Sequence, residues 1–215
     1  PPPSTLKTPS SMVLRLLAPT VREKGLDLEL DFDLFLPHRF IGDAGRVRQI
    51  LTNLIGNAML VLLNDDALMN RLRNNPDDIP AMVEEALRWD PPIQCTFRRA
   101  TQDDNIEGVD VKTGDMVIPM WAGANWDPEV FPNPEQFDID RPTTKPHMGF
   151  GFGPHFCAGA ELARLETKIA FEELLGRLGE IKLDESESDL SHLPSFASHG
   201  YQKLCAACSR VSLGT

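Results

Sequence analysis

The sequence predicts a mainly α-helical fold with small β-sheets, and three observations support this. Apolar residues recur at helical spacing in two stretches, IPAMVEEALRW and AELARLETKIAFEELLGRL. Between them lie short runs of strand-forming residues, broken by the turn dipeptides Glu107-Gly108 and Thr113-Gly114. A glycine-rich loop leads directly into the second helical stretch. We therefore expect helices to supply the core and the strands to form small hairpins.

The composition is that of a globular protein long enough to bury a substantial core. Of the 215 residues, 41% are hydrophobic and 25% are charged. The net charge of −11 argues against nucleic acid or an anionic membrane surface as a partner. We see no apolar run long enough to span a bilayer and no signal peptide. Four cysteines form no small disulfide framework in a chain of this length, which favours a reducing cytoplasm.

The first part of the chain changes character near residue 12. Residues 1–11 are rich in proline and serine and are predicted to be a disordered tail. A helix is expected over residues 12–21, and alternating apolar and acidic residues predict a strand over residues 26–32. Another helix is expected to begin near Asp43 and to continue through Ala58.

Residues 12–58 resemble the start of the ATP-binding domain of sensor histidine kinases. The matching stretch is DAGRVRQILTNLIGNA, in which Asn53 and Asn57 lie one helical turn apart on one face. The resemblance implies that Asn57 occupies the position of a magnesium ligand beside the nucleotide phosphates. The glycine-rich boxes that complete such a site do not follow in this sequence. An ATP-binding kinase fragment is one alternative function.

The helix IPAMVEEALRW is expected to begin at Asp78 or Pro80. Glu85 and Arg88 lie three positions apart on one face of it. Such a pair is either a solvated surface ion pair or part of a buried network. After the Pro91-Pro92 break, short strands are expected as far as residue 120, followed by an irregular proline-rich loop.

The stretch FGFGPHFCAG, residues 150–159, carries the strongest chemical signal. It places Cys157 where a glycine-rich loop meets a helix N-terminus, and there the amide groups and the helix dipole favour a thiolate. Cys157 is therefore a candidate metal ligand, and the alternative is a buried structural cysteine. The helix is predicted over residues 160–178, an acidic solvated loop over residues 182–191, and a frayed C-terminus after Leu204.

This loop resembles the heme-binding loop of the cytochrome P-450 family, and residues 53–215 resemble the C-terminal half of that fold. The resemblance implies a heme cofactor and makes Cys157 the catalytic residue, as the axial thiolate on iron. Arg98 would bind a heme propionate, with Arg99 as its rival because neighbours on a strand point to opposite faces. The other heme-binding positions implied are Phe150, Gly151, Gly153, His155 and Gly159.

Glu85 and Arg88 match the buried ion pair that holds the heme-loop side of the family's fold together. Gln136 stands where many members carry an arginine that completes this network, and Arg141 could substitute for it. By contrast, Cys205 and Cys208 form a C-x-x-C pair without the further ligands of a zinc site or the setting of a redox motif. We interpret that pair as incidental.

The family consists of heme-thiolate monooxygenases, and soluble bacterial members are the most similar. They insert one oxygen atom into a small organic substrate with electrons from a ferredoxin or a reductase. The family's acid and threonine, which deliver protons to iron-bound dioxygen, correspond to Gln49 and Ile50. Glutamine cannot shuttle a proton by ionising and isoleucine has no hydroxyl. Because the upstream half of the fold also has no match, we expect a truncated heme site without coupled oxygen activation.

The heptapeptide TNLIGNA, residues 52–58, fits both families, and we place a junction there. The chain is therefore predicted to be chimeric, through recombination, artificial design or an assembly error. A third alternative function follows, namely a non-functional hybrid that binds neither ATP nor heme.

Overall fold

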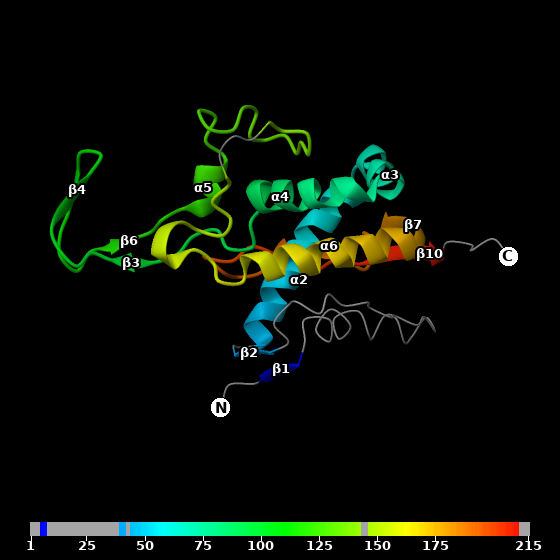
Figure 1. Cartoon of the computed structure of the whole chain (residues 1–215), viewed down its shortest axis with the longest axis horizontal. Helices are drawn as coiled ribbons and strands as arrows, with labels where there is room; N and C mark the ends of the chain where they lie inside the picture. The colour runs from blue at the N-terminus through cyan, green and yellow to red at the C-terminus, as the bar shows by residue number, and fades with distance from the viewer. Residues whose placement is uncertain (1–4, 8–38, 42–43, 143–145, 211–215) are drawn as a thin grey trace.

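The computed structural model describes residues 5–7, 39–41, 44–142 and 146–210. Its body is a group of packed helices, α2 (Ala44–Leu63), α3 (Asp66–Asn74), α4 (Ile79–Trp89) and α6 (Ala160–Arg177). Helix α2 runs across α4 and α6, which lie roughly alongside each other (Figure 1). The shorter helical segments are η1 (Pro76–Asp78), α5 (Trp121–Asn125) and η2 (Gly153–His155).

One hydrophobic core joins these helices to strand β7 (Leu178–Leu183). The apolar stripe predicted for α6 is only partly buried, because Leu162 and Ile169 remain half-exposed. The inward face of α6 instead carries Glu166 and Thr167, both fully enclosed. The largest fully buried apolar side chains are Leu54, Leu62, Leu72, Ile79, Met82, Val83, Leu87 and Phe171.

Within the described residues the strands form five antiparallel pairs. The pairs are β1 (Thr5–Lys7) with β2 (Arg39–Ile41), β3 (Arg98–Arg99) with β6 (Met116–Val117), β4 (Asp104–Ile106) with β5 (Val109–Val111), β7 with β10 (Ala206–Arg210), and β8 (Asp189–His192) with β9 (Tyr201–Lys203). Both predicted turns are present, since Gly108 and Gly114 have φ angles of +86° and +94°. The mainly helical fold with small sheets is confirmed.

Three expectations about the ends of the chain differ from the structure. Strand β1 lies inside the predicted disordered tail, where it pairs with β2 more than thirty residues later in the chain. Strand β10 lies inside the C-terminus that was expected to fray, because it pairs with β7. The acidic stretch 182–191, expected to be a solvated loop, belongs partly to strands, because residues 182–183 are in β7 and residues 189–191 are in β8. The helix and strand expected over residues 12–32 lie outside the described residues.

Helix α2 passes without a break through residues 52–58, where the sequence resembles two families. Its two asparagines are buried in the interior. Asn57 donates from Nδ2 to the carbonyl of Asp90 at 3.1 Å, and Asn53 lies so close to Gly200 that a Cβ atom there would be 2.5 Å from its Cγ. Both side chains therefore serve packing, and neither is exposed to a nucleotide.

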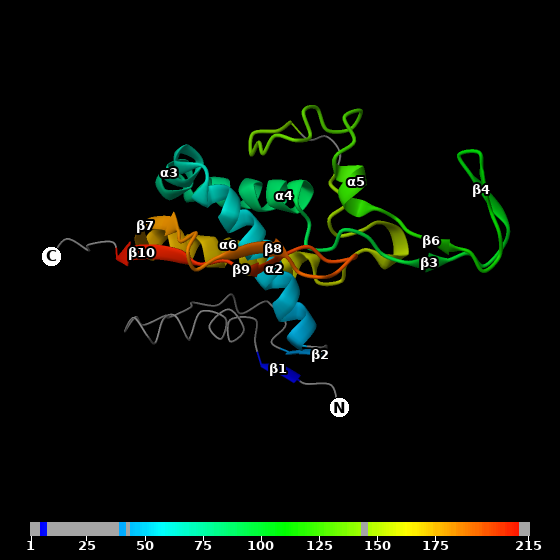
Figure 2. The same ribbon diagram turned by 180° about the vertical axis from the view of Figure 1, so that it is seen from behind.

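Hydrogen bonds join the hairpin of β8 and β9 to the C-terminal end of α4. His199 Nδ1 lies 2.6 Å from Oδ1 of Asp90, and the amide of His199 donates to the carbonyl of Pro92 at 2.8 Å. A further main-chain bond joins Gln94 to Ala197. Figure 2, seen from behind, shows these strands on the side of α6 that faces the viewer. Among the described helices, none is long and apolar enough to cross a membrane.

Candidate functional site

Cys157 lies in a loop that its own backbone closes before α6 begins. Its amide donates to the carbonyl of Phe150 at 2.9 Å, and its carbonyl accepts from Ala160 at 3.2 Å. Gly151 and Gly153 have φ angles of +74° and +70°, which side chains other than glycine rarely adopt. The thiol forms no disulfide and is exposed just ahead of the helix N-terminus, so the alternative of a buried structural cysteine is wrong.

Large aromatic side chains in this loop and in two other segments are exposed. Phe152 and Phe156 in the loop are 71% and 51% exposed. Phe97 and Phe196 come from segments far apart in the sequence, yet their ring centroids lie 6.4 Å apart and both are about half-exposed or more. Both views show the loop beside β3 and β6 (Figures 1 and 2). An exposed thiol within an aromatic surface fits a flat, apolar group that carries a metal.

The donor set fits a metal held by a single protein ligand. Within the described parts of the chain, no three histidine, cysteine, aspartate or glutamate side chains come together as a metal site would require. Cys157 is the exposed cysteine among those residues. A metal ion bound here would need its other donors from a ligand such as a porphyrin, so the residues present fit heme.

The two candidate arginines differ in where they make contacts. Arg98 is half-exposed on β3 and donates to the carbonyl of Phe97 at 2.9 Å, and it has no ion pair within the described residues. Arg99 is directed toward the turn at Thr113-Gly114, where it donates to the carbonyl of Gly114 at 3.2 Å. This arrangement favours Arg98 for an anionic group near the loop. His155, in η2, is exposed two residues before Cys157.

Glu85 and Arg88 form a fully buried ion pair rather than a solvated one. Their side chains are 5% and 1% exposed, and the guanidinium donates to both carboxylate oxygens at 2.8 Å. Arg88 also donates to the carbonyls of Asn125, Pro134 and Gln136 at 2.9–3.1 Å. The ion pair thus ties α4 to the proline-rich loop in front of Cys157.

Arg141 completes this network in the way the sequence suggested. Its Nε lies 3.2 Å from Oε1 of Glu85, and its side chain is 5% exposed. It also donates to carbonyls of the proline-rich loop, those of Asn133 and Gln136 at 3.2 and 2.7 Å and that of Pro132. Glu85 therefore forms ion pairs with two arginines, Arg88 and Arg141.

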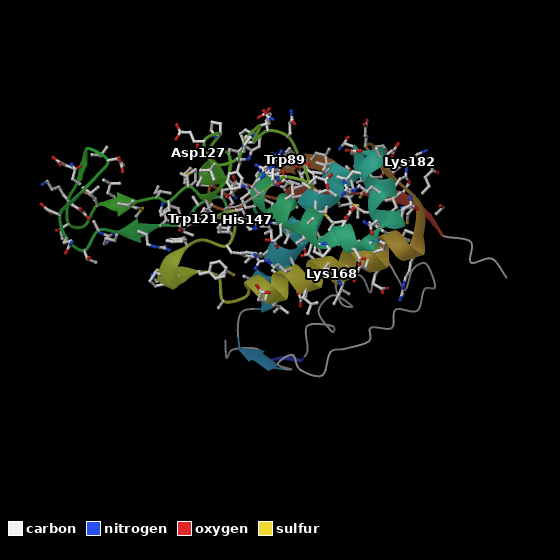
Figure 3. The ribbon with its side chains drawn as sticks, turned by 45° about the horizontal axis from the view of Figure 1, so that its top comes forward. Trp89, Trp121, Asp127, His147, Lys168 and Lys182 are labelled. Carbon is white, nitrogen blue, oxygen red and sulfur yellow. The ribbon has the colours of Figure 1, made fainter. Side chains whose placement is uncertain are left out.

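A second network was not anticipated from the sequence and lies nearer to the loop. Glu84 accepts from Arg164 on α6 at 2.6 and 3.0 Å and contacts His147 Nε2 at 3.1 Å. Burial alone would raise the pKa of Glu84, but the hydrogen bonds from His147 and Arg164 outweigh it and lower that pKa to about 2. Figure 3 shows His147 between α4 and the loop. The only signal in the sequence is that Glu84 adjoins the predicted Glu85.

Glu166 is a buried carboxyl without a partner. It is 2% exposed, and neither carboxylate oxygen has a hydrogen-bond partner among the residues that the structure describes. Burial raises its pKa to about 7. Sequence periodicity could not reveal this, because a glutamate one turn from apolar residues reads as a solvent-facing position.

The chain is similar in sequence to members of one protein family. A cytochrome P-450 family model matches residues 65–198. Cytochrome P-450 109 of Bacillus spizizenii is 42% identical over 153 residues, which cover 71% of this chain and 38% of that protein. The biotin biosynthesis cytochrome P-450 of Bacillus subtilis is 44% identical over 135 residues, which cover 63% of this chain and 34% of that protein.

The chain is also similar to solved structures of cytochromes P-450. The substrate-free form of the cytochrome P-450 CYP150A6 of Mycobacterium marinum matches with a TM-score of 0.75 and 30% identity. That match covers 78% of this chain and 43% of the solved chain. This chain thus spans less than half the length of these relatives.

Proposed function

The chain belongs to the cytochrome P-450 family, and we propose that it binds heme through Cys157 as the proximal part of a heme-thiolate monooxygenase site. One observation carries the proposal, namely the exposed, unpaired cysteine just before α6 in a loop whose aromatic side chains Phe152 and Phe156 are also exposed. Heme is the cofactor of this family. The alternative of an ATP-binding fragment loses its basis, because Asn53 and Asn57 are buried.

Each candidate residue has a distinct part in holding the cofactor. Cys157 would supply the thiolate ligand to the heme iron. Gly151 and Gly153 would keep the loop free of side chains at its left-handed turns. Arg98 and His155 would bind the propionates, since a guanidinium fork matches a carboxylate. Phe150 and Gly159, on either side of Cys157, would pack beside the sulfur.

The reaction of the family's whole proteins is proposed here only in part. When bound, thiolate-ligated heme supplies oxygen activation, in which the thiolate pushes electron density toward O–O cleavage. The substrate would be a small organic molecule, and a ferredoxin or reductase in the cytoplasm would supply electrons. Gln49 and Ile50 on α2 cannot move a proton by ionising, so we do not expect these 215 residues to couple electron delivery to product formation.

A hemin titration tests the proposal through the fluorescence of the tryptophans. Trp121 lies beside the loop, where a Cβ atom on Gly151 would be 3.9 Å from its ring, so bound hemin should quench it. We expect saturation at one hemin per chain and a roughly ten-fold weaker affinity for Cys157→Ala, equivalent to about 1.4 kcal/mol. Cys205→Ala is the matched control, because Cys205 lies outside the loop. Equal affinities of all three proteins would refute ligation by Cys157.

A turnover assay tests the part about oxygen chemistry. With NADPH, a ferredoxin and its reductase, we expect consumption of electrons without a matching amount of oxygenated product. Stoichiometric product would show that the chain couples the reaction despite Gln49 and Ile50.

A further inference from the structure

His147 occupies a position that connects helix α4 to the backbone of the cysteine loop. Its side chain is 8% exposed, and its two ring nitrogens have different partners. Nδ1 accepts from the amide of Gly149 at 3.0 Å, and Nε2 lies 3.1 Å from a carboxylate oxygen of Glu84. Because a backbone amide can only donate, Nδ1 must be the bare nitrogen and Nε2 must carry the proton. The two contacts therefore fix the tautomer.

Glu84, at the α4 end of this connection, is also held by a second side chain. Glu84 is held from the other side by two hydrogen bonds from Arg164, which also places its guanidinium 4.7 Å from the centroid of the Phe150 ring. Glu84 stands on α4 and Arg164 on α6, so the carboxylate that orients His147 bridges both helices that flank the loop.

The loop end of the connection leads directly to the cysteine. Gly149 lies so close to α4 that a Cβ atom there would be 2.6 Å from the carbonyl oxygen of Leu87. The next residue, Phe150, accepts from the amide of Cys157 at 2.9 Å, and its ring packs beside those of His147 and Phe156 at centroid distances of 5.9 and 6.3 Å. The position of Gly149 thus sets where the Cys157 amide is held.

We propose that His147 is a positioning residue for the thiolate ligand, which it fixes by accepting the Gly149 amide at Nδ1 while Glu84 orients its ring. The inference rests on the proposed function for its significance, since a fixed loop matters only if Cys157 ligates heme. It goes further, because it assigns the position of the ligand to a side chain ten residues away whose contacts are with Glu84, Gly149 and Phe150.

Three substitutions separate positioning from simple space filling. His147→Ala removes both contacts. His147→Asn keeps an acceptor at the place of Nδ1 but cannot reach Glu84, and His147→Gln keeps a donor near the place of Nε2 but lacks the acceptor for Gly149. Positioning through Nδ1 predicts that the asparagine variant restores the loop and the glutamine variant does not. A space-filling role predicts the opposite order, because glutamine is closer to histidine in volume.

The first measurement is hydrogen exchange of the segment 148–157 in the heme-free chain. We expect about five-fold faster exchange in the alanine and glutamine variants, as one lost hydrogen bond implies, and nearly the original rate in the asparagine variant. The second is the fraction of added hemin that shows the thiolate-ligated spectrum when reduced with carbon monoxide, which should fall in the same order.

The outcomes keep the two proposals apart. If all four proteins exchange equally over this segment, the role of His147 is overturned whatever the spectra show. If exchange follows the predicted order but the original chain shows no thiolate band, the loop is positioned as proposed and the assignment of Cys157 as a heme ligand fails. If both follow the predicted order, both stand.

Discussion

Replacing Arg88 with methionine should strongly destabilise the fold. The guanidinium makes five hydrogen bonds, two to Glu85 and three to backbone carbonyls, and its side chain is 1% exposed. Removing one partner of a buried ion pair costs about 3–5 kcal/mol, because the other charge stays buried. Glu85 would keep Nε of Arg141 at 3.2 Å and the amide of Asp138 at 3.0 Å, which limits the loss. We therefore expect about 4 kcal/mol.

Urea denaturation followed by circular dichroism measures this directly. A loss of about 4 kcal/mol is a large part of the roughly 5–15 kcal/mol that stabilises a natural domain. With a slope of about 1–3 kcal/mol per molar urea, it should lower the midpoint by roughly 1.3–4 M. The matched control is Arg71→Met, whose ion pair with Asp140 is exposed on both sides and should change the midpoint little. Equal midpoints for the two variants would refute the reasoning that burial makes the Arg88 pair essential.

Three further predictions concern single side chains. Glu166→Gln should stabilise the fold above pH 7 by up to about 3 kcal/mol. The pKa of Glu166, raised to about 7, makes the stability of the original chain fall as pH rises from about 4.5 to 7. Chemical denaturation at a series of pH values should show that fall only in the original chain. Gly149→Ala should lower the free energy of unfolding by about 1–3 kcal/mol, since its Cβ would meet the carbonyl of Leu87 at 2.6 Å; unchanged thermal unfolding would contradict this. Arg141→Met should lower the free energy of unfolding by about 2 kcal/mol through the lost contact with Glu85, which is less than the loss expected for Arg88→Met. A lower urea midpoint for Arg141→Met than for Arg88→Met would contradict this supporting role of Arg141.

Periodicity and turn chemistry predicted most of the fold. The helices α4 and α6 and the turns at Gly108 and Gly114 follow from local residue patterns, which act over a few positions. Strand β10 could not be predicted in this way, because it exists only through pairing with β7, about 25 residues earlier in the chain. The local sequence of this C-terminal segment has little preference for a strand, and its pairing with β7 determines its conformation.

The candidate site was predicted through its motif, and its supporting contacts were not. Cys157 stands out because glycines and a helix start flank it in sequence. His147 gives no comparable signal, since its partner Glu84 stands 63 residues before it. Arg164, the second partner of Glu84, stands 17 residues after His147, and the three side chains meet only in the folded chain. Burial of Glu166 has the same cause, because exposure depends on which face of α6 the other helices cover.

The reduced, carbon-monoxide-bound absorbance spectrum of the hemin-loaded chain tests the assignment of Cys157 most directly. We predict a red-shifted Soret band of thiolate-ligated heme that disappears in Cys157→Ala and persists in Cys205→Ala. A band typical of histidine-ligated or free heme, unchanged by the Cys157 substitution, would contradict the assignment and leave a chain with the family's fold and no heme-thiolate site.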